Sequence, residues 1–166
     1  HLHLQGIALS PYLDDWLLHA PSESQLLREL EMVCQCLRSP GFLLNLQKCK
    51  LIPSQDLTFI GARFRTDVNM VYLPHTRVEA LQRLLSVVIH SPFVSGRVWM
   101  RLQGHMAASV FTVPWAHFHL RPLWIHLHSH WDSNVSSFED LIPVSPEVIP
   151  HLQWWTVQEN LLKGVC

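Results

Sequence analysis

The stretch SPYLDDWLL, residues 10–18, sets two adjacent carboxylates between apolar runs and restricts the fold more than any other feature. Apolar residues alternate with their neighbours on both sides of the acids. Alternation with a period of two is typical of strands. The sequence therefore predicts a β-hairpin over residues 6–20, with Leu13, Asp14 and Asp15 at its turn.

The acid pair must be neutralised or fully hydrated. Its nearest Lys or Arg along the chain is Arg28. Two carboxylates a few Å apart repel by about 1 kcal/mol in water and by several times more in a drier setting. A divalent cation bound by both acids is one solution, and a fully solvated turn is the other.

The amino-acid composition limits the classes of protein to which this chain can belong. Apolar residues make up 48% of the 166 residues and charged residues only 15%, which predicts a globular chain with surfaces that something else covers. The chain opens on His1 and ends abruptly, as an excerpt of a longer polypeptide would. No apolar run approaches the roughly 20 residues of a membrane span. We expect an intracellular protein, cytoplasmic or nuclear and not secreted, with its cysteines as reduced thiols.

The charges are distributed unevenly along the chain. Acids dominate the first 31 residues, whereas arginines outnumber acids between Arg63 and Arg101. An acidic site followed by an arginine-bearing module suits a protein that binds metal ions and then a polyanion.

A helix is predicted to follow the hairpin. Ser22 and Gln25 have the spacing of a capping box, and Pro40-Gly41 ends the apolar repeat. The apolar stripe consists of Leu26, Leu27, Leu30, Val33, Cys34 and Leu37. Short strands are then predicted over residues 42–51, 57–64 and 70–73.

Helices are predicted after Pro74. Thr76 and Glu79 have capping-box spacing before the first, and Gly104 predicts close packing of a second helix over residues 96–110. The apolar repeat of the first helix is Val78, Leu81, Leu85 and Val88, and that of the second is Val98, Leu102 and Met106. Residues 114–140 have no clean period, and a last helix starts near residues 145–150.

Several motifs together resemble reverse transcriptases. Tyr12-Leu13-Asp14-Asp15 matches the YxDD box of that family, and residues 41–48 resemble the Gly, Asn and Lys pattern that follows it. Phe59-Ile60-Gly61 resembles the primer-grip turn, Leu73-Pro74 the entry into the thumb, and residues 101–104 the second thumb helix. The resemblance covers residues 7 to about 105. The amino-acid sequence of residues 12–18 and 53–55 is most similar to that of DIRS-type retrotransposons.

The resemblance implies an α+β fold in three parts. Residues 1–73 would form the C-terminal part of a polymerase palm, made of a β-hairpin, a helix and short antiparallel strands. Residues 74–113 would form a helical thumb. Residues 114–166, with Trp154-Trp155, resemble a connection leading toward a ribonuclease H domain.

The same resemblance implies a catalytic site for nucleotidyl transfer. Asp14 would be the first metal ligand and Asp15 its supporting neighbour, with Mg²⁺ as the cofactor and Mn²⁺ as an alternative. Tyr12 would pack near the primer terminus. Lys48 would act on the triphosphate as a charge partner or proton donor, or it is an ordinary exposed lysine.

The implied partners are an RNA or DNA template-primer, deoxynucleotide triphosphates and the rest of a retroelement polyprotein, with no membrane. Phe59 and Gly61 would shape a primer grip, or they are strand core and a bulge. The arginines would contact phosphates, or they lie on a solvated helix face. They are Arg77, Arg83, Arg97 and Arg101.

The His- and Trp-rich segment 114–131 allows two interpretations. Alternating histidines on a strand would point one way and bind a metal, but no carboxylate or Cys joins them at ligand spacing, so packing is the better account. These histidines are His117, His119, His126, His128 and His130. Six tryptophans are expected in the core rather than as base-stacking platforms. They are Trp99, Trp115, Trp124, Trp131, Trp154 and Trp155.

The sequence thus indicates part of an RNA-directed DNA polymerase that is inactive as this chain alone. The family needs a third carboxylate on an upstream palm strand, as well as fingers, and no acid precedes Asp14. Two alternatives stay open. In the first the chain is a decayed retroelement copy, and in the second it is a nucleic-acid-binding or interaction module without catalysis.

Overall fold

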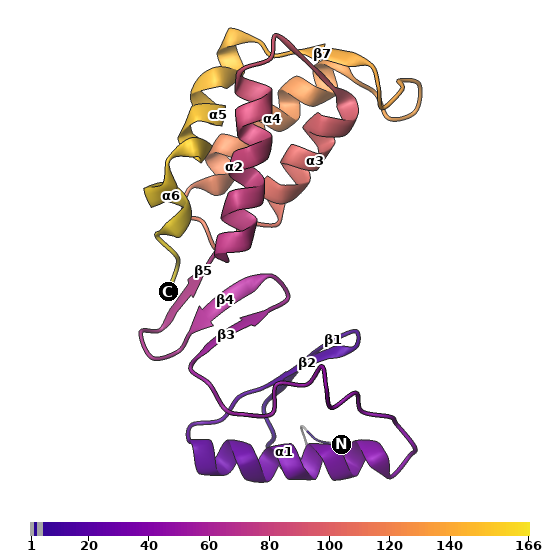
Figure 1. The fold of residues 1–166 in the computed structure, drawn as a ribbon, viewed down its shortest axis with the longest axis vertical. Helices are drawn as coiled ribbons and strands as arrows, with labels where there is room; N and C mark the ends of the chain where they lie inside the picture. Colours follow the sequence, from indigo (N-terminus) through magenta and orange to yellow (C-terminus); the bar gives the residue numbers. More distant parts are fainter. Residues whose placement is uncertain (1, 3–4) are drawn as a thin grey trace. The chain divides into compact units, whose positions relative to one another are not determined.

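The computed structural model describes residue 2 and residues 5–166. The chain divides into two compact units, with unit 1 ending at Ile60 and unit 2 running from Gly61 to Cys166. Helices and small antiparallel sheets occur together, which confirms the predicted α+β class. Each unit is described by itself below (Figure 1).

Unit 1 contains the predicted hairpin. Strands β1 (Leu9–Tyr12) and β2 (Asp15–Leu18) are antiparallel, and their register pairs Tyr12 with Asp15. The turn therefore contains two residues, Leu13 and Asp14, rather than the three that the sequence predicted. Asp15 is already the first residue of β2, because pairing with Tyr12 extends the ladder to the turn.

Helix α1 (Glu23–Arg38) follows the hairpin, as predicted. The Ser22 hydroxyl accepts a hydrogen bond from the Gln25 backbone N–H at 3.3 Å, which satisfies one free donor of the first turn. Val33 on the predicted stripe is buried, but Leu27 is 45% exposed and does not belong to the buried face.

The predicted strand over residues 42–51 is wrong. The backbone N–H groups of Lys48 and Cys49 both donate to the Asn45 carbonyl, at 3.0 and 3.2 Å. These bonds close a local turn and take up groups that a strand would use for pairing. The segment is irregular, and unit 1 ends in β3 (Asp56–Phe59).

The predicted strand over residues 57–64 is interrupted by a tight turn at Ile60 and Gly61, both with positive φ, 41° and 83°. After the turn, β4 (Ala62–Arg65) pairs antiparallel with β5 (Met70–Tyr72), which confirms the strand predicted near residues 70–73. The strand order is β3, β4, β5.

The other elements of unit 2 are helices with one further strand pair. In Figure 1, α2, α3, α4 and α5 lie side by side, and α2 is the helix that follows β5. Strands β6 and β7 pair antiparallel. The elements are α2 (His75–Ile89), β6 (Phe93–Ser95), α3 (Gly96–Ala107), α4 (Ala116–His130), β7 (Leu141–Pro143), η2 (Pro146–Val148), α5 (Ile149–Thr156) and α6 (Gln158–Leu162).

One hydrophobic core holds the helices of unit 2 together. Trp99 of α3 and Trp155 of α5 are fully buried in it, so segments 74–113 and 114–166 share this core. The apolar repeat predicted for α2 is buried throughout, which confirms the helical period. Its members are Val78, Leu81, Leu85 and Val88.

Two details predicted for these helices are wrong. Helix α2 begins at His75 after Pro74 and has no side-chain cap, so Thr76 and Glu79 form no capping box. Pro74 fixes an extended residue before the helix and sets its start. A Cβ on Gly104 would meet nothing within 4 Å, so this glycine marks no close helix contact.

The structure also shows whether any described helix could cross a membrane. Among the residues that it describes, no helix is both long enough and apolar enough to cross a bilayer.

The buried α2 stripe predicts a large effect of Leu85→Ala, because Leu85 is 0% exposed and the smaller side chain leaves a cavity. We expect the free energy of unfolding to fall by about 2 to 5 kcal/mol. Tryptophan fluorescence in a denaturant titration measures it, since all tryptophans except Trp16 lie in unit 2. Val87→Ala on the same helix is the matched control, because Val87 is 54% exposed. Equal losses for both variants would contradict the assigned core.

Candidate functional site

The acid pair lies at a short and locally fixed turn. Leu13 has a φ of 49°, in the left-handed region that non-glycine residues rarely adopt. The Trp16 indole N–H donates to the Leu13 carbonyl at 3.1 Å and ties the turn to β2. The hairpin thus presents Asp14 and Asp15 on backbone that is paired up to the turn.

The two carboxylates are exposed and have no partner. Within residues 5–166, neither Asp14 nor Asp15 has a hydrogen bond or ion pair to its side chain. Their oxygens are hard donors of the kind that Mg²⁺ prefers, so the donor chemistry fits this ion. In the same described part of the chain no group of three metal-ligating side chains occurs. A cation bound here would take only part of its coordination shell from the pair and would need other ligands.

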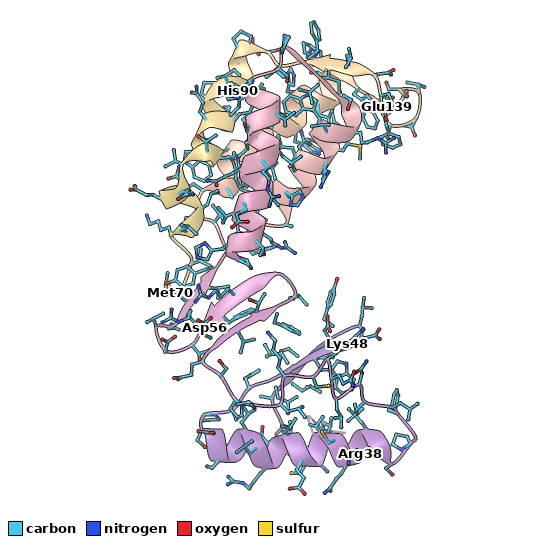
Figure 2. The ribbon with its side chains drawn as sticks, viewed as in Figure 1. Arg38, Lys48, Asp56, Met70, His90 and Glu139 are labelled. Atoms are coloured by element: carbon cyan, nitrogen blue, oxygen red, sulfur yellow. The ribbon has the colours of Figure 1, made fainter. Side chains whose placement is uncertain are left out.

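Tyr12 and Lys48 are also available at the surface of unit 1. Tyr12, the last residue of β1, is 54% exposed. Lys48, labelled in Figure 2, lies in the irregular segment between α1 and β3 and is exposed. None of the described ion pairs includes Lys48, so the structure does not join it to the acid pair.

In unit 2, two predicted residues come together that the sequence did not relate. A Cβ built on Gly61 would lie on the guanidinium of Arg77, with Nε at 2.8 Å. Gly61 therefore lets the Arg77 side chain lie directly against the turn between β3 and β4. Phe59, on the other side of this turn, is half-buried in β3.

Two of the four predicted arginines are held by carboxylates. Arg83 lies 3.6 Å from Glu79, one turn earlier on α2. Arg97 donates from Nε to Glu139 at 2.8 Å, and its guanidinium lies over the Phe138 ring. Glu139 is labelled in Figure 2. These two arginines have local partners that compete with a phosphate.

The other two arginines form a cationic group with a histidine that sequence reasoning missed. His105 lies one turn after Arg101 on α3, and both Arg101 and Arg77 act on it electrostatically. Burial and then the repulsion from these two arginines hold the pKa of His105 below its ordinary value. We call Arg77, Arg101 and His105 the α2–α3 cation cluster. The i, i+4 spacing of Arg101 and His105 was the signal that could have found it.

The histidines of segment 114–131 lie on α4 rather than on a strand. His126 is buried and hydrogen-bonds through Nε2 to the Pro143 carbonyl at 2.8 Å. His128 and His130 are exposed, each with Nδ1 bonded to a carbonyl one turn earlier. On a helix, alternate histidines do not share one face.

The tryptophans divide between core and surface. Trp99, Trp131 and Trp155 belong to the buried core, as expected. Trp115 and Trp124 are exposed, at 75% and 54%, contrary to that expectation. Trp115 precedes α4 in a left-handed backbone conformation, with a φ of 65°.

Comparison with solved structures relates this fold to a reverse transcriptase. The chain is similar to a foamy viral protease-reverse transcriptase that was solved in complex with double-stranded DNA. The TM-score is 0.67 and the sequence identity is 19%, over 95% of this chain and 25% of that chain. This likeness establishes an α+β fold that resembles a region of a reverse transcriptase. The chain spans about a quarter of the length of that protein.

Comparisons of the sequence itself give no match. No model of a known protein family matches the chain, and no curated protein matches it.

The positive φ of 83° at Gly61 predicts that Gly61→Ala is destabilising. We expect a loss of about 1 kcal/mol or more in the free energy of unfolding, because an L-residue is strained in this conformation and the new methyl group displaces Arg77. Gly104→Ala is the control, since it lies in open space on α3 and should stabilise by up to about 1 kcal/mol. Thermal unfolding measures both variants, and a neutral Gly61→Ala would be inconsistent with the turn.

Proposed function

We propose that this chain is part of a retroelement reverse transcriptase that extends a primer by metal-assisted nucleotidyl transfer. The observation that carries the proposal is the unpartnered Asp14 and Asp15 at the two-residue hairpin turn, in a chain whose fold resembles a reverse transcriptase region. The sequences of residues 12–18 and 53–55, which are most similar to DIRS-type retrotransposons, favour an element of that type.

In this proposal the residues of unit 1 act on the nucleotide and the primer end. Asp14 and Asp15 hold the cations, and the paired strands keep the two carboxylates in place while substrate binds. Bound Mg²⁺, or Mn²⁺ in its place, supplies Lewis-acid stabilisation of the attacking and leaving oxygens. Tyr12 packs near the primer terminus, and Lys48 offers charge or a proton to the pyrophosphate.

The proposed macromolecular partner is a template-primer duplex of RNA or DNA. The similar foamy viral protein was solved with double-stranded DNA, and the α2–α3 cation cluster gives this chain a positive site for phosphates. Phosphate contacts of this kind are independent of base sequence and sensitive to salt. Phe59 and Gly61 would shape the primer grip, in a palm that precedes a helical thumb.

The proposed activity needs more than this chain. A third carboxylate and a nucleotide-holding fingers region belong to the rest of the retroelement polyprotein, and a ribonuclease H domain would follow the connection-like segment 114–166. The setting is the cytoplasm or nucleus, where template and deoxynucleotide triphosphates occur.

Primer extension tests the catalytic proposal. A longer protein that includes the preceding coding sequence should extend a primer with Mg²⁺, and Asp14→Asn should abolish extension. The 166-residue chain alone should give no extension. Extension by that chain, or full activity of the Asp14→Asn protein, would overturn the proposal. Failure of the longer protein to extend any primer would favour a decayed copy.

The second candidate function is a nucleic-acid-binding module without catalysis, and the α2–α3 cation cluster favours it. Asp14→Ala separates the two candidates. Loss of Mg²⁺-dependent primer-template binding in this variant supports the polymerase, whereas unchanged binding supports the module.

Removal of one cluster arginine should weaken duplex binding in a salt-dependent way. We expect Arg77→Ala and Arg101→Ala each to lower the slope of log affinity against log salt concentration by about 1. Arg83→Ala is the control, because Arg83 already has Glu79 as its partner and should change the slope less. Fluorescence anisotropy with a labelled primer-template measures the slopes. An Arg83→Ala effect equal to the other two would argue against the cluster.

Duplex binding should strengthen as the pH falls, because of His105. In the free chain its pKa is lowered by burial and by the two arginines, whereas a bound phosphate raises it. The complex therefore takes up a proton, and affinity rises as the pH falls toward the pKa of the free chain, which lies below the ordinary imidazole value of 6.5. His105→Gln should flatten this dependence relative to the His128→Gln control. Identical pH profiles for the wild type and His105→Gln would contradict the assignment.

A further inference from the structure

Two histidines from different helices of unit 2 meet through equivalent nitrogens. His119 lies in the first turn of α4 and His151 in the first turn of α5. Their Nδ1 atoms are 3.3 Å apart, and both side chains are half-buried. Both helices contribute residues to the hydrophobic core of unit 2.

Aromatic neighbours hold the two imidazoles in position. The Trp154 ring stacks on His119, with centroids 4.1 Å apart and planes 8° from parallel. Phe118 packs by its edge against both imidazoles, with centroid distances of 5.1 and 6.2 Å. Rings that are fixed before a ligand arrives lose little freedom when it binds.

The separation of the two nitrogens fits a bound metal. Two imidazole nitrogens at about 2.0 to 2.1 Å from a tetrahedral zinc ion are about 3.3 to 3.4 Å apart. The observed distance of 3.3 Å lies in this range. Burial and the neighbouring His151 lower the pKa of His119, which favours the neutral imidazole that a metal ligand requires.

We propose that the Nδ1 atoms of His119 and His151 bind a Zn²⁺-like transition-metal ion. Without metal, one Nδ1 carries a proton, and this N–H donates a hydrogen bond to the other Nδ1. On binding, that proton moves through solvent to Nε2 of the same ring, so both Nδ1 lone pairs face the ion and no net proton is released. Water completes the shell, since no group of three metal-ligating side chains occurs within residues 5–166.

This site is independent of the proposed polymerase function. Its ligands are nitrogens rather than the carboxylate oxygens of the hairpin, so it selects a softer ion than Mg²⁺. Because only two protein side chains hold the ion, it exchanges with ions in solution. Sequence reasoning could not find it, because His151 is 32 residues from His119 and outside the histidine-rich segment.

Calorimetric titration of the full chain with zinc chloride tests the site. We expect one Zn²⁺ site whose affinity falls by about tenfold or more in His119→Gln and in His151→Gln, since each loses a direct ligand. His128→Gln, an exposed histidine on the same helix, is the matched control and should retain the wild-type affinity. Circular dichroism establishes that each variant is folded.

A second measurement avoids substitution altogether. Nitrogen-15 spectra of the wild-type histidines should show Zn²⁺ shifting the Nδ1 signals of His119 and His151 before those of the other histidines. Wild-type affinity in both glutamine variants would overturn the proposal. Uniform small shifts across all histidine signals would overturn it as well.

Discussion

The repulsion between two adjacent carboxylates is the constraint on which the functional account of this chain depends. Asp14 and Asp15 follow each other across the boundary between a two-residue turn and β2, and no described cation neutralises them. At an exposed site this repulsion costs only about 1 kcal/mol, which a folded chain tolerates. In the proposed site a divalent cation would offset this repulsion, and the cross-strand pairing up to Tyr12 and Asp15 holds the backbone of the two acids in place.

The two units carry candidate groups of opposite charge. Unit 1 offers unpartnered acid oxygens, which suit a metal-bound triphosphate, and unit 2 offers the α2–α3 cation cluster, which suits a phosphate backbone. The cluster rests on helices that are fixed by buried Trp99 and Trp155. Gly61 belongs to this arrangement because its missing side chain gives the Arg77 guanidinium room beside the β3–β4 turn.

Features set by neighbouring residues were predictable from the sequence. The hairpin, the Ser22 cap of α1 and the buried stripe of α2 all follow from alternation, capping spacing or helical period. The failures have local causes as well. The Asn45 carbonyl closes a turn where apolar residues indicated a strand, and the Ile60-Gly61 turn divides another predicted strand in two. Contacts between residues that are far apart in the sequence could not be predicted from it. Examples are the contact of Arg77 with Gly61 and that of His119 with His151.

Paramagnetic broadening by Mn²⁺ tests the central claim most directly, because this ion replaces Mg²⁺ at oxygen sites and broadens nearby amide signals. In a nitrogen-15-labelled chain, substoichiometric Mn²⁺ should broaden the amides of residues 12–16 first, and Asp14→Asn with Asp15→Asn should remove that broadening. Broadening that begins elsewhere, or that persists at residues 12–16 in the double variant, would contradict the account.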